Sequence, residues 1–558
     1  MVEAGACVLL LFCSLFSGLV YYRDFFWEHE NKVTTNEKPN FIIILADDIG
    51  WGDILTNESD NTTPWLNMLK LEGKRFTDFH SPASTCSPSR AALLTGRHGL
   101  RNGVTHNFAK GSVGGLPLNE TTFAQLLRDA GYYTAMIVLS LFLVIGKWHL
   151  GHSGFYHPIS RGFEYYLGIP YSNDMGCTDK PGFDLPSCSP CEQSKHSSRK
   201  DGGCDAKTAL PLFENQTIVE QPLDLWALTE KYAKASVTQI LTARNKGKPF
   251  LLYVALAHMH VPLFHNCFLN VTAKEAYSAS LSDMDSLVGR IKQAIDTFRI
   301  ENTLIWFTGD NGPWEQKCEF AGSTGPFQGK WQTSRGGGSA KRTTWEGGHR
   351  VPSVVVWPGK ISPNTTSNAL LSGMDIFPTI LSLAGVDPPS DRHYDGIDVV
   401  HILLNESDTG HKSLMHPNSG AAGQFGDLQT VRVGHYKAFY ITGGAEACRG
   451  GSGKQELHDP PLIFNLDTDE AEGSPLDPAS EEYQLILKEV EREREELLWD
   501  IATDNVSTAD YTVSQSAVPC CQPQNPACRC HRRERSAQSH ARSKESNANG
   551  FNVPKRNS

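Results

Sequence analysis

Three apolar runs constrain the fold of this 558-residue chain more than any other feature of its sequence. They span residues 41–45, 250–256 and 303–308, and each lacks the polar alternation of a half-exposed strand. Such continuous runs are typical of strands buried on both faces of a largely parallel sheet. Helical patterns lie between them, for example over residues 120–130, which end at Gly131. The sequence therefore predicts an α/β fold with a large, mostly parallel sheet flanked by helices.

Side chains that can bind ligands follow each of these runs directly. Because the carboxyl ends of parallel strands meet at one edge of a sheet, we expect these side chains to lie close together. The oxygen donors among them suit Ca²⁺ or Mg²⁺ rather than zinc. Taken singly, each of these donors is more often part of a helix cap, turn or loop than a metal ligand. The set is Asp47 and Asp48 after the first run, His258 and His260 after the second, and Asp310 and Asn311 after the third.

The segment Cys86-Ser87-Pro88-Ser89-Arg90 predicts the start of a helix, because proline has a helical φ and lacks only an N–H that the first turn leaves unpaired. Cys86 then lies at the helix N-terminus. The free N–H groups and the helix dipole favour an anion there, so we expect the pKa of the thiol to be lowered. The alternative is a disulfide-bonded cysteine before an ordinary helix.

Three further segments carry cationic or imidazole side chains, at residues 146–151, 257–262 and 341–348. Lys147, His149 and Lys341 are the candidates besides the histidines already named. Lysine and histidine beside a divalent cation neutralise a compact anion and its transition state. The alternative is that the histidines are structural and that Lys341 is a surface lysine.

Charge and targeting signals limit the partners and the compartment. The formal net charge is −11 and the body of the chain has no basic stripe, which argues against nucleic acid as a partner. Residues 1–22 are typical of a secretory signal peptide, and we expect no membrane span in the mature chain. Entry into the secretory pathway is also indicated by eight Asn-X-Ser/Thr sequons, at Asn57, Asn61, Asn119, Asn215, Asn270, Asn364, Asn405 and Asn505.

The fourteen cysteines fit an oxidising compartment. A disulfide knot is predicted at Cys520, Cys521, Cys528 and Cys530, and a disulfide-pinned loop at Cys177, Cys188, Cys191 and Cys204. Zinc at the second group is disfavoured because no further ligands stand at zinc-finger spacing. Cys267 is predicted to be unpaired, and the disulfide connectivity stays open.

The character of the chain changes after residue 410. We predict a large α/β domain over residues 38–410, a small antiparallel β domain over 411–530 and a disordered basic tail over 531–558. The small domain has predicted strands at residues 428–433 and 436–441. It also has a predicted helix from Glu481 to Ile501, whose core side chains are Leu487, Val490, Leu497, Leu498 and Ile501.

Four segments together resemble one enzyme family. The Cys86 segment continues into Ala91-Ala92-Leu93-Leu94-Thr95-Gly96-Arg97, and the chain also contains Asp-Asp-Ile-Gly-Trp-Gly-Asp at 47–53, Gly-Lys-Trp-His-Leu-Gly at 146–151 and Asp-Asn-Gly at 310–312. In combination they are similar to the type I sulfatases, and the similarity runs over residues 39–530. The resemblance implies an alkaline-phosphatase-like α/β domain with a small C-terminal β domain, in agreement with the strand pattern.

The resemblance also implies the chemistry of the site. Cys86 is expected to be oxidised to formylglycine by the formylglycine-generating enzyme, and its hydrate to supply the nucleophile. One Ca²⁺ is expected on Asp47, Asp48, Asp310, Asn311 and the modified residue 86. Arg90 and Lys147 are expected to hold the modified residue, and His149 to deprotonate the hydrate. The sulfate is expected to bind His260, which is preferred to His258 because it precedes Val-Pro, and Lys341, with Ser172 on the substrate side.

The implied substrates are sulfate esters: aryl sulfates in vitro, and a sulfated glycosaminoglycan, the glucosamine 3-O-sulfate of heparan sulfate, in nature. The implied location is the lysosome, reached through the secretory pathway, with secretion as an additional route. A phosphatase or phosphodiesterase of the same superfold is the first alternative. Such enzymes usually pair two zinc ions with histidine ligands and a serine or threonine nucleophile, so the oxygen donors and Cys86 count against it.

One segment departs from the family pattern. The apolar run over residues 135–145 is several residues longer than its family counterpart, yet shorter than the ~20 residues that span a membrane. It is either an insertion or an error in the gene model. A true insertion is expected to displace Lys147 and His149, and the second alternative is therefore an inactive, secreted binding protein.

Overall fold

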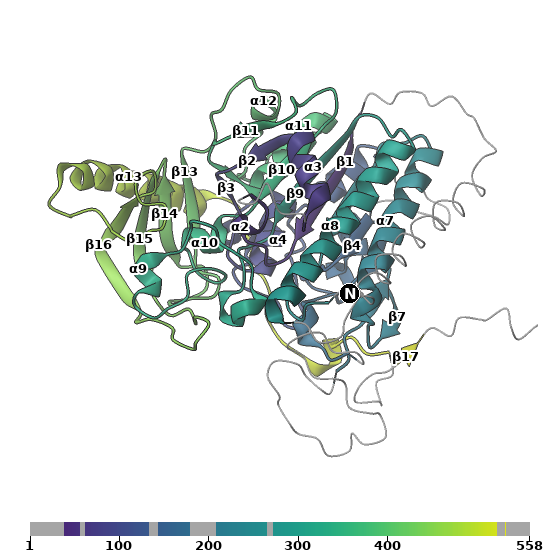
Figure 1. Ribbon diagram of the computed structural model, residues 1–558, viewed down its shortest axis with the longest axis horizontal. Coiled ribbons are helices and arrows are strands. Elements are labelled where there is room, and N and C mark those ends of the chain that lie inside the picture. The colour runs from purple at the N-terminus through teal and green to yellow at the C-terminus, as the bar shows by residue number, and fades with distance from the viewer. Residues whose placement is uncertain are drawn as a thin grey trace, which may run out of the picture.

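The computed structural model describes residues 38–55, 62–132, 143–178, 208–264, 272–521 and 530–531. Figure 1 shows a large sheet with helices packed against it, and a smaller sheet with one long helix at the left of the view. In this part of the chain, no helix combines the length and the apolar character needed to cross a membrane. The predicted signal peptide and nearly all of the predicted tail lie outside the described residues.

The large sheet is mixed and mostly parallel, as predicted. Its strand order is β11-β2-β10-β9-β1-β8-β4-β5-β6-β7-β17, and the neighbours from β9 to β5 are all parallel. The three apolar runs become its adjacent central strands. The bounds are β1 Asn40–Ala46, β2 Lys74–Phe76, β4 Leu143–Gly146, β5 Tyr165–Gly168, β6 Leu212–Glu214, β7 Thr217–Gln221, β8 Leu251–Ala255, β9 Thr303–Gly309, β10 Ser353–Val356, β11 Thr365–Ser367 and β17 Cys530–His531. A separate pair is formed by β3 Phe79–His80 and β12 Leu371–Ser372.

Successive residues of β1 face two different cores. Ile42 and Ile44 lie in a cluster with residues of α3, α7 and α8, whereas Ile43 and Leu45 lie in a cluster with residues of α4, α6 and α11. The alternation arises because neighbouring side chains of a strand point to opposite faces. The helices of the large domain are α2 Trp51–Leu55, α3 Pro64–Glu72, α4 Cys86–Thr95, α5 Gly99–Asn102, α6 Phe123–Asp129, α7 Leu228–Asn245, α8 Ala273–Thr297, α9 Lys330–Thr333, α10 Glu346–His349, α11 Ile376–Ala384 and α12 Val400–Leu403.

Helix α6 is shorter than the predicted span of residues 120–130. It begins after Thr122, which exchanges hydrogen bonds with Gln125 in a capping box. Glu120 is excluded from the helix because its carboxylate is buried against Arg97 and the hydroxyl of Ser507. The pattern therefore located the helix correctly but not its first turn.

The small sheet is antiparallel, as predicted, with the order β13-β14-β15-β16. Its strands are β13 Ser413–Pro417, β14 Leu428–Val433, β15 Tyr436–Thr442 and β16 Glu456–Asn465. Helix α13, Glu481–Thr503, packs Tyr483, Ile486 and Val490 into the core of this sheet, with Leu487 partly buried. Of the other predicted core positions, Leu497, Leu498 and Ile501 are only half-buried and lie outside that core.

After α13 the chain returns to the large domain. Val513 forms a β-bridge with Ser112, and β17 pairs with β7 at the edge of the large sheet. The described residues of the segment 411–530, predicted as one small domain, are thus divided between the small sheet and the surface of the large domain. The hydrophobic pattern could not show this, because the returning segment contains no long periodic element.

Disulfide bonds are present as the composition predicted. Cys318 and Cys448 join a loop of the large domain to the turn between β15 and β16. Cys177, Cys520 and Cys521 are also disulfide-bonded. The predictions for Cys188, Cys191, Cys204, Cys267 and Cys528 lie outside the described residues.

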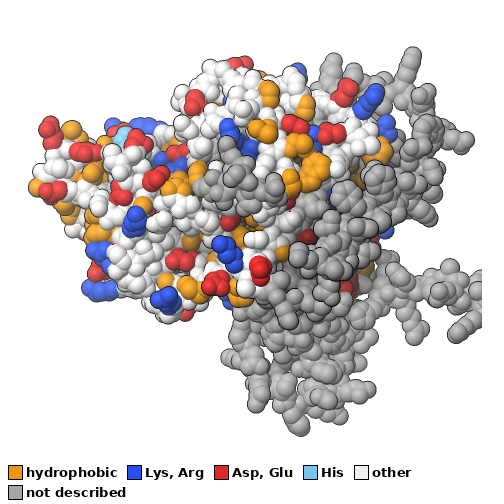
Figure 2. All heavy atoms as spheres, in the orientation of Figure 1, with side chains coloured by type: hydrophobic (Ala, Val, Ile, Leu, Met, Phe, Trp, Pro, Cys, Tyr) orange, Lys and Arg blue, Asp and Glu red, His pale blue; other side chains and the backbone are white. Residues whose placement is uncertain are grey.

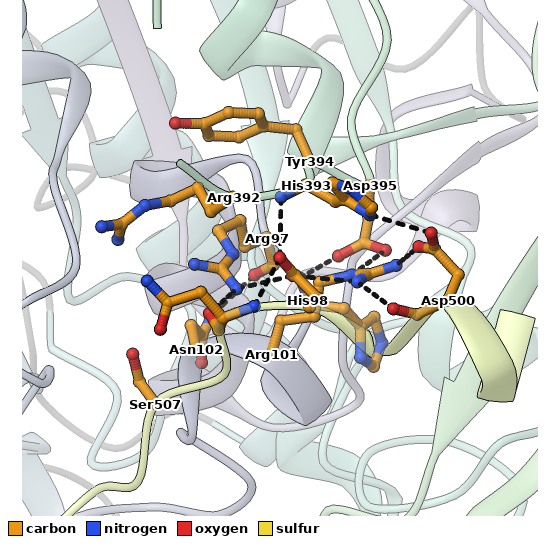
Figure 3. A network of polar contacts seen from close by, with 12 residues as sticks. Arg97, His98, Arg101, Asn102, Arg392, His393, Tyr394, Asp395, Asp500 and Ser507 are labelled. Carbon is orange, nitrogen blue, oxygen red and sulfur yellow. Dashed lines mark hydrogen bonds and ion pairs between the residues drawn. The ribbon is translucent and has the colours of Figure 1, made fainter. Parts of the chain in front are cut away.

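Buried arginines connect the two domains (Figure 3). Arg101, 2% exposed, donates from Nε to Asp395 Oδ1 at 2.9 Å and from Nη1 to Asp504 Oδ2 at 2.9 Å, and it also pairs with Asp500. Arg97 Nη2 reaches the same Asp504 oxygen at 2.9 Å. These contacts join α5 to the end of α13.

We expect Arg101→Ala to lower the free energy of unfolding by about 3–5 kcal/mol, because the change leaves buried carboxylates without their partner. Chemical denaturation of the purified chain measures the loss. The matched control is Arg128→Ala. Its side chain is 37% exposed and, among the described residues, pairs with the exposed Asp129, so we expect a change within about 0.5 kcal/mol. Equal losses for the two variants would show that the network does not stabilise the domain junction.

Candidate active site

The carboxyl ends of β1 and β9 bring four oxygen-donor side chains together. The strands pair in parallel up to Ala46 and Gly309, and the amide of Asp310 donates to Ala46 O at 2.9 Å. The amide of Asp48 lies 3.2 Å from Asp310 Oδ1, and Asn311 Nδ2 donates to Asp48 Oδ1 at 2.7 Å. Asp47, Asp48, Asp310 and Asn311 are all at most 2% exposed. The structure thus shows the convergence of strand ends that the sequence predicted.

This cluster has the character of a site for a hard cation. Asn311 Oδ1 is buried and has no hydrogen-bond partner among the described residues. Burial raises the pKa of Asp310 to about 6 and raises the pKa of Asp48, although nearby cations, Arg90 at Asp310 and Lys341 at Asp48, oppose the shifts. Single ligand atoms of Asp47, Asp48, Cys86 and His260 lie within 4.8 Å of one another. A divalent cation with a preference for oxygen fits these donors.

Cys86 is the first residue of α4 and is a free, fully buried thiol, so the disulfide alternative does not apply to it. Lys147 Nζ lies 3.2 Å from its Sγ, and the thiol lies 3.6 Å from Asp47 Oδ1. The predicted acidification is wrong: burial raises the pKa of Cys86 to about 12, although Lys147 and Lys341 oppose the shift. Desolvation of a thiolate outweighs the helix dipole and the two cations here.

Three buried cations surround the carboxylates. Arg90 donates from Nε to Asp310 Oδ2 at 2.8 Å and from Nη1 to the carbonyl of Lys147 at 2.7 Å. Lys147 Nζ lies 2.6 Å from Asp47 Oδ2, and Lys341 Nζ lies 2.6 Å from Asp48 Oδ1. The neighbouring carboxylates raise the pKa of both lysines against the effect of burial, so both stay charged. Lys341 is 7% exposed and is therefore not a surface lysine.

The two histidines after β8 have different surroundings. His260 Nε2 lies 3.1 Å from Ser172 Oγ and 3.7 Å from Asp48 Oδ2, and Ser172 Oγ also accepts from Lys147 Nζ at 3.2 Å. His258 Nε2 instead lies 3.0 Å from Thr229 Oγ1 on α7. His260 and Ser172 thus belong to the cluster, whereas His258 is directed to helix α7.

His149 lies beside the cluster in the left-handed backbone region, with φ 60°. Its Nε2 lies 3.0 Å from the carbonyl oxygen of Phe108, and its Nδ1 has no hydrogen-bond partner among the described residues. Because a carbonyl only accepts, Nε2 carries the proton and Nδ1 is left as an acceptor. Its own carbonyl accepts from Ser87 Oγ at 2.7 Å.

The apolar segment before Lys147 does not displace it in the structure. Residues 133–142 lie outside the described part, but the end of the segment forms β4 between β8 and β5. The amide of Lys147 donates to Ala255 O at 2.7 Å, which holds the residue at the carboxyl end of the sheet. Lys147 therefore reaches Cys86 despite the unusual length of the preceding run.

Sequence reasoning missed two residues that organise the cluster. Asn107 Oδ1 accepts from the amide of Ser87 at 2.8 Å and supports the first turn of α4. Trp314 lies against His260, with 5.2 Å between the ring centroids, and Lys341 Nζ lies 4.6 Å from its ring centre. Because Trp314 follows Asp310 by only four residues, its position in the sequence could have suggested that it lies near the site. Nothing in the sequence around Asn107 pointed to its contact.

Known proteins resemble this chain over nearly its whole length. The family model "Sulfatase" matches residues 39–386, and the model "C-terminal region of aryl-sulfatase" matches residues 409–530. Arylsulfatase G of Rattus norvegicus is 58% identical over 527 residues, which cover 94% of this chain and 98% of that protein. Arylsulfatase G of Homo sapiens is 57% identical over 500 residues, covering 89% and 94%.

A solved structure agrees with these relatives. The PsFucS1 sulfatase from Pseudoalteromonas sp. superimposes with a TM-score of 0.68 at 26% identity, covering 85% of this chain and 92% of that one. The resemblance predicted from the four sequence segments is confirmed, and so is the alkaline-phosphatase-like fold. The chain therefore belongs to the sulfatase family and is a sulfuric ester hydrolase.

Proposed function

We propose that the chain hydrolyses the 3-O-sulfate of glucosamine in heparan sulfate, using a formylglycine formed from Cys86 by the formylglycine-generating enzyme and one bound Ca²⁺. The observation that carries the proposal is the position of Cys86: a free thiol at the first turn of α4, 3.2 Å from Lys147 Nζ and next to the four oxygen donors. A buried thiol with a raised pKa is a poor nucleophile itself, which favours its conversion to another group.

The hydrate of the aldehyde, when formed at residue 86, has two hydroxyl groups. One attacks sulfur, with release of the alcohol. Deprotonation of the other then reforms the aldehyde and expels sulfate. Lys147 and Arg90 hold this residue, Lys147 from its Nζ and Arg90 through its contacts with Asp310 and the Lys147 carbonyl. His149 is the base for the second hydroxyl, because its Nδ1 is the free acceptor when Nε2 donates to Phe108.

Asp47, Asp48, Asp310 and Asn311 would hold the Ca²⁺, with the oxygen of the modified residue 86 as a further ligand. The cation would stabilise negative charge on the nucleophile and on the sulfate. The three carboxylates are already balanced by Arg90, Lys147 and Lys341. A bound divalent cation thus leaves the site with excess positive charge, which suits an anionic ester.

Lys341, His260 and Ser172 form the substrate side of the site. Lys341 and His260 contact the same Asp48 carboxylate and the same indole, so both face one space beside the oxygen donors. They bind the sulfate and protonate the leaving oxygen. Ser172 connects Lys147 with His260 and orients the imidazole.

The relatives named arylsulfatase G support sulfate esters as the substrate class. The proposed location is the lysosome, reached through the secretory pathway that the signal peptide and the sequons indicate. The exposure of the glycosylation sequons also supports passage through the secretory pathway. The five sequon asparagines in the described part of the chain, Asn119, Asn215, Asn364, Asn405 and Asn505, are all exposed. Glycans at these positions would project into solvent without disturbing the core.

Mass spectrometry of the tryptic peptide that carries Cys86, after expression in a secretory host, tests the modification. We expect the mass change from cysteine to aldehyde, together with release of sulfate from glucosamine 3-O-sulfate. Wholly unmodified thiol and no sulfate release would favour the inactive binding protein. Two zinc ions per chain instead of one Ca²⁺ would favour a phosphatase or phosphodiesterase.

A further inference from the structure

We propose that Arg342 binds a second anionic group of the substrate, a sulfate or a carboxylate next to the sulfate that is cleaved. The inference rests on the proposed function of Lys341 and extends it to substrate preference. Arg342 follows Lys341 in the loop before α10, at the side of the site that holds His260 and Trp314.

The backbone of Arg342 is held in a conformation that arginine rarely adopts. Its φ is 77°, in the left-handed region that favours glycine. The amide of Arg342 donates to the carbonyl of Ser84 at 2.8 Å, and the amide of Thr343 donates to Ala340 O at 3.0 Å. Strained positions of this kind persist where the surrounding contacts impose them, and they are concentrated at functional sites. The backbone of Arg342 is therefore fixed by its hydrogen bond with Ser84, which precedes Cys86 by two residues.

The stem of the side chain is also fixed. Gly420, in the loop after β13, packs so closely against it that a Cβ at this glycine would lie 2.7 Å from Arg342 Cβ and 2.8 Å from its Cγ. Gly420 is itself held by Asn418, whose Oδ1 accepts from the glycine amide at 3.0 Å. The small domain thus confines the first carbons of Arg342 and directs the position of its head group.

The guanidinium group, by contrast, has no acidic partner among the described residues. It forms no hydrogen bond or ion pair with any residue that the structure describes, and its Cζ lies 5.2 Å from the centre of the Trp314 ring. Other arginines near the domain junction differ: Arg350 and Arg432 both pair with Asp78 and Glu346. Arg342 is half-buried, so its charge is held in place yet accessible.

The same indole lies beside Lys341 Nζ, at 4.6 Å, and beside the His260 ring, at 5.2 Å. Lys341 forms an ion pair with Asp48, whereas Arg342 forms no ion pair with any described residue. Figure 2 shows acidic and basic side chains interspersed over one face of the described residues, without a broad basic area there. A guanidinium group is well suited to recognise one anion of a polyanionic sugar chain, because its donors match sulfate and carboxylate groups in pairs.

The test compares kcat/KM for glucosamine 3-O-sulfate with kcat/KM for two substrates that carry a second anion: glucosamine 2-N,3-O-disulfate, and a disaccharide in which the 3-O-sulfated sugar is followed by a uronate. We expect Arg342→Gln to reduce the ratio of kcat/KM for a doubly anionic substrate to that for the single sulfate about tenfold, because a hydrogen bond to a charged group contributes about that much to affinity. The substrate whose advantage disappears identifies the second group as sulfate or carboxylate.

Two further variants separate charge from backbone effects. Arg342→Lys keeps the charge and is expected to retain most of the preference. Arg342→Gly is expected to lose the preference without a lower Tm, since glycine adopts this φ freely. The matched control is Arg335→Gln, which removes the same charge from the same stretch of chain. Arg335 lies 3.3 Å above the Trp331 ring and donates to Trp331 O, outside the cluster, and we expect an unchanged preference.

An equal loss on all three substrates, or no change in their ratio, would overturn the proposal. Binding of the same three compounds to the Cys86→Ala chain, measured by calorimetry with Ca²⁺ present, needs no turnover. A preference that persists there and is lost on adding Arg342→Gln supports the second anion position even if formylglycine chemistry fails. Binding without any preference rejects the position even if turnover is normal.

Discussion

Cys86→Ala is expected to abolish the hydrolysis of sulfate esters, with a fall in kcat of at least about 10⁴-fold, because Cys86 is the only free cysteine among the described residues and therefore the only one there that can be converted to the aldehyde. The thiol is fully buried at the start of α4 and alanine is a good helix former, so we expect the variant to fold. Release of 4-nitrophenol from its sulfate ester measures the loss, and the Tm checks the fold.

Cys86→Ser is the informative companion to this change. Serine offers one hydroxyl and no second one, so it has no route to expel sulfate by reforming a carbonyl. We expect no sustained turnover, and at most one sulfate group per chain in the intact mass after incubation with substrate. Sustained activity in either variant would remove formylglycine from the mechanism.

Lys147→Ala is expected to lower kcat/KM for aryl sulfates by about 10²–10³-fold, as on loss of one well-placed electrostatic contact. Its ammonium group lies 2.6 Å from Asp47 Oδ2, 3.2 Å from Cys86 Sγ and 3.2 Å from Ser172 Oγ, so it joins the oxygen donors, the nucleophile position and the substrate side. The same assay measures the effect, and the free energy of unfolding is determined in parallel.

Lys437→Ala provides the matched control for this variant. Lys437 is also fully buried and its Nζ lies 2.7 Å from Glu346 Oε1, but it belongs to β15 of the small sheet. We expect it to lower stability by about 3–5 kcal/mol while the folded fraction keeps its kcat. If Lys147→Ala retained full activity, Lys147 would have no part in the site, and the unusual apolar run before it would no longer matter to function.

Much of the fold was predictable because it depends on short-range patterns. Continuous apolar runs identified β1, β8 and β9, and the rule that parallel strands share their carboxyl edge predicted that Asp48 and Asp310 would meet. The alternating strands at residues 428–433 and 436–441 likewise identified β14 and β15. These predictions need only the hydrophobic period of each segment.

The errors have a different origin, since they concern burial and contacts between distant parts of the chain. The raised pKa of Cys86 depends on how completely α4 is covered, which the helix start alone does not reveal. The return of the chain to the large domain after α13 depends on the contacts of Val513 with Ser112 and of β17 with β7. The contact of Trp314 with His260 and the contact of Arg342 with Gly420 likewise join residues that are far apart in sequence.

By itself, the sequence determined the class of the fold, the strand ends that carry ligands and the resemblance to sulfatases, because residue type and spacing are sufficient for these. The sequence also favoured His260 over His258, and His260 is the one that lies near Asp48. Only the tertiary structure decided that Lys147 reaches Cys86 despite the apolar run before it, and that Arg342 has no acidic partner among the described residues. The physical reason is that burial, ion pairing and orientation are properties of the packed chain, in which residues up to several hundred positions apart share one space.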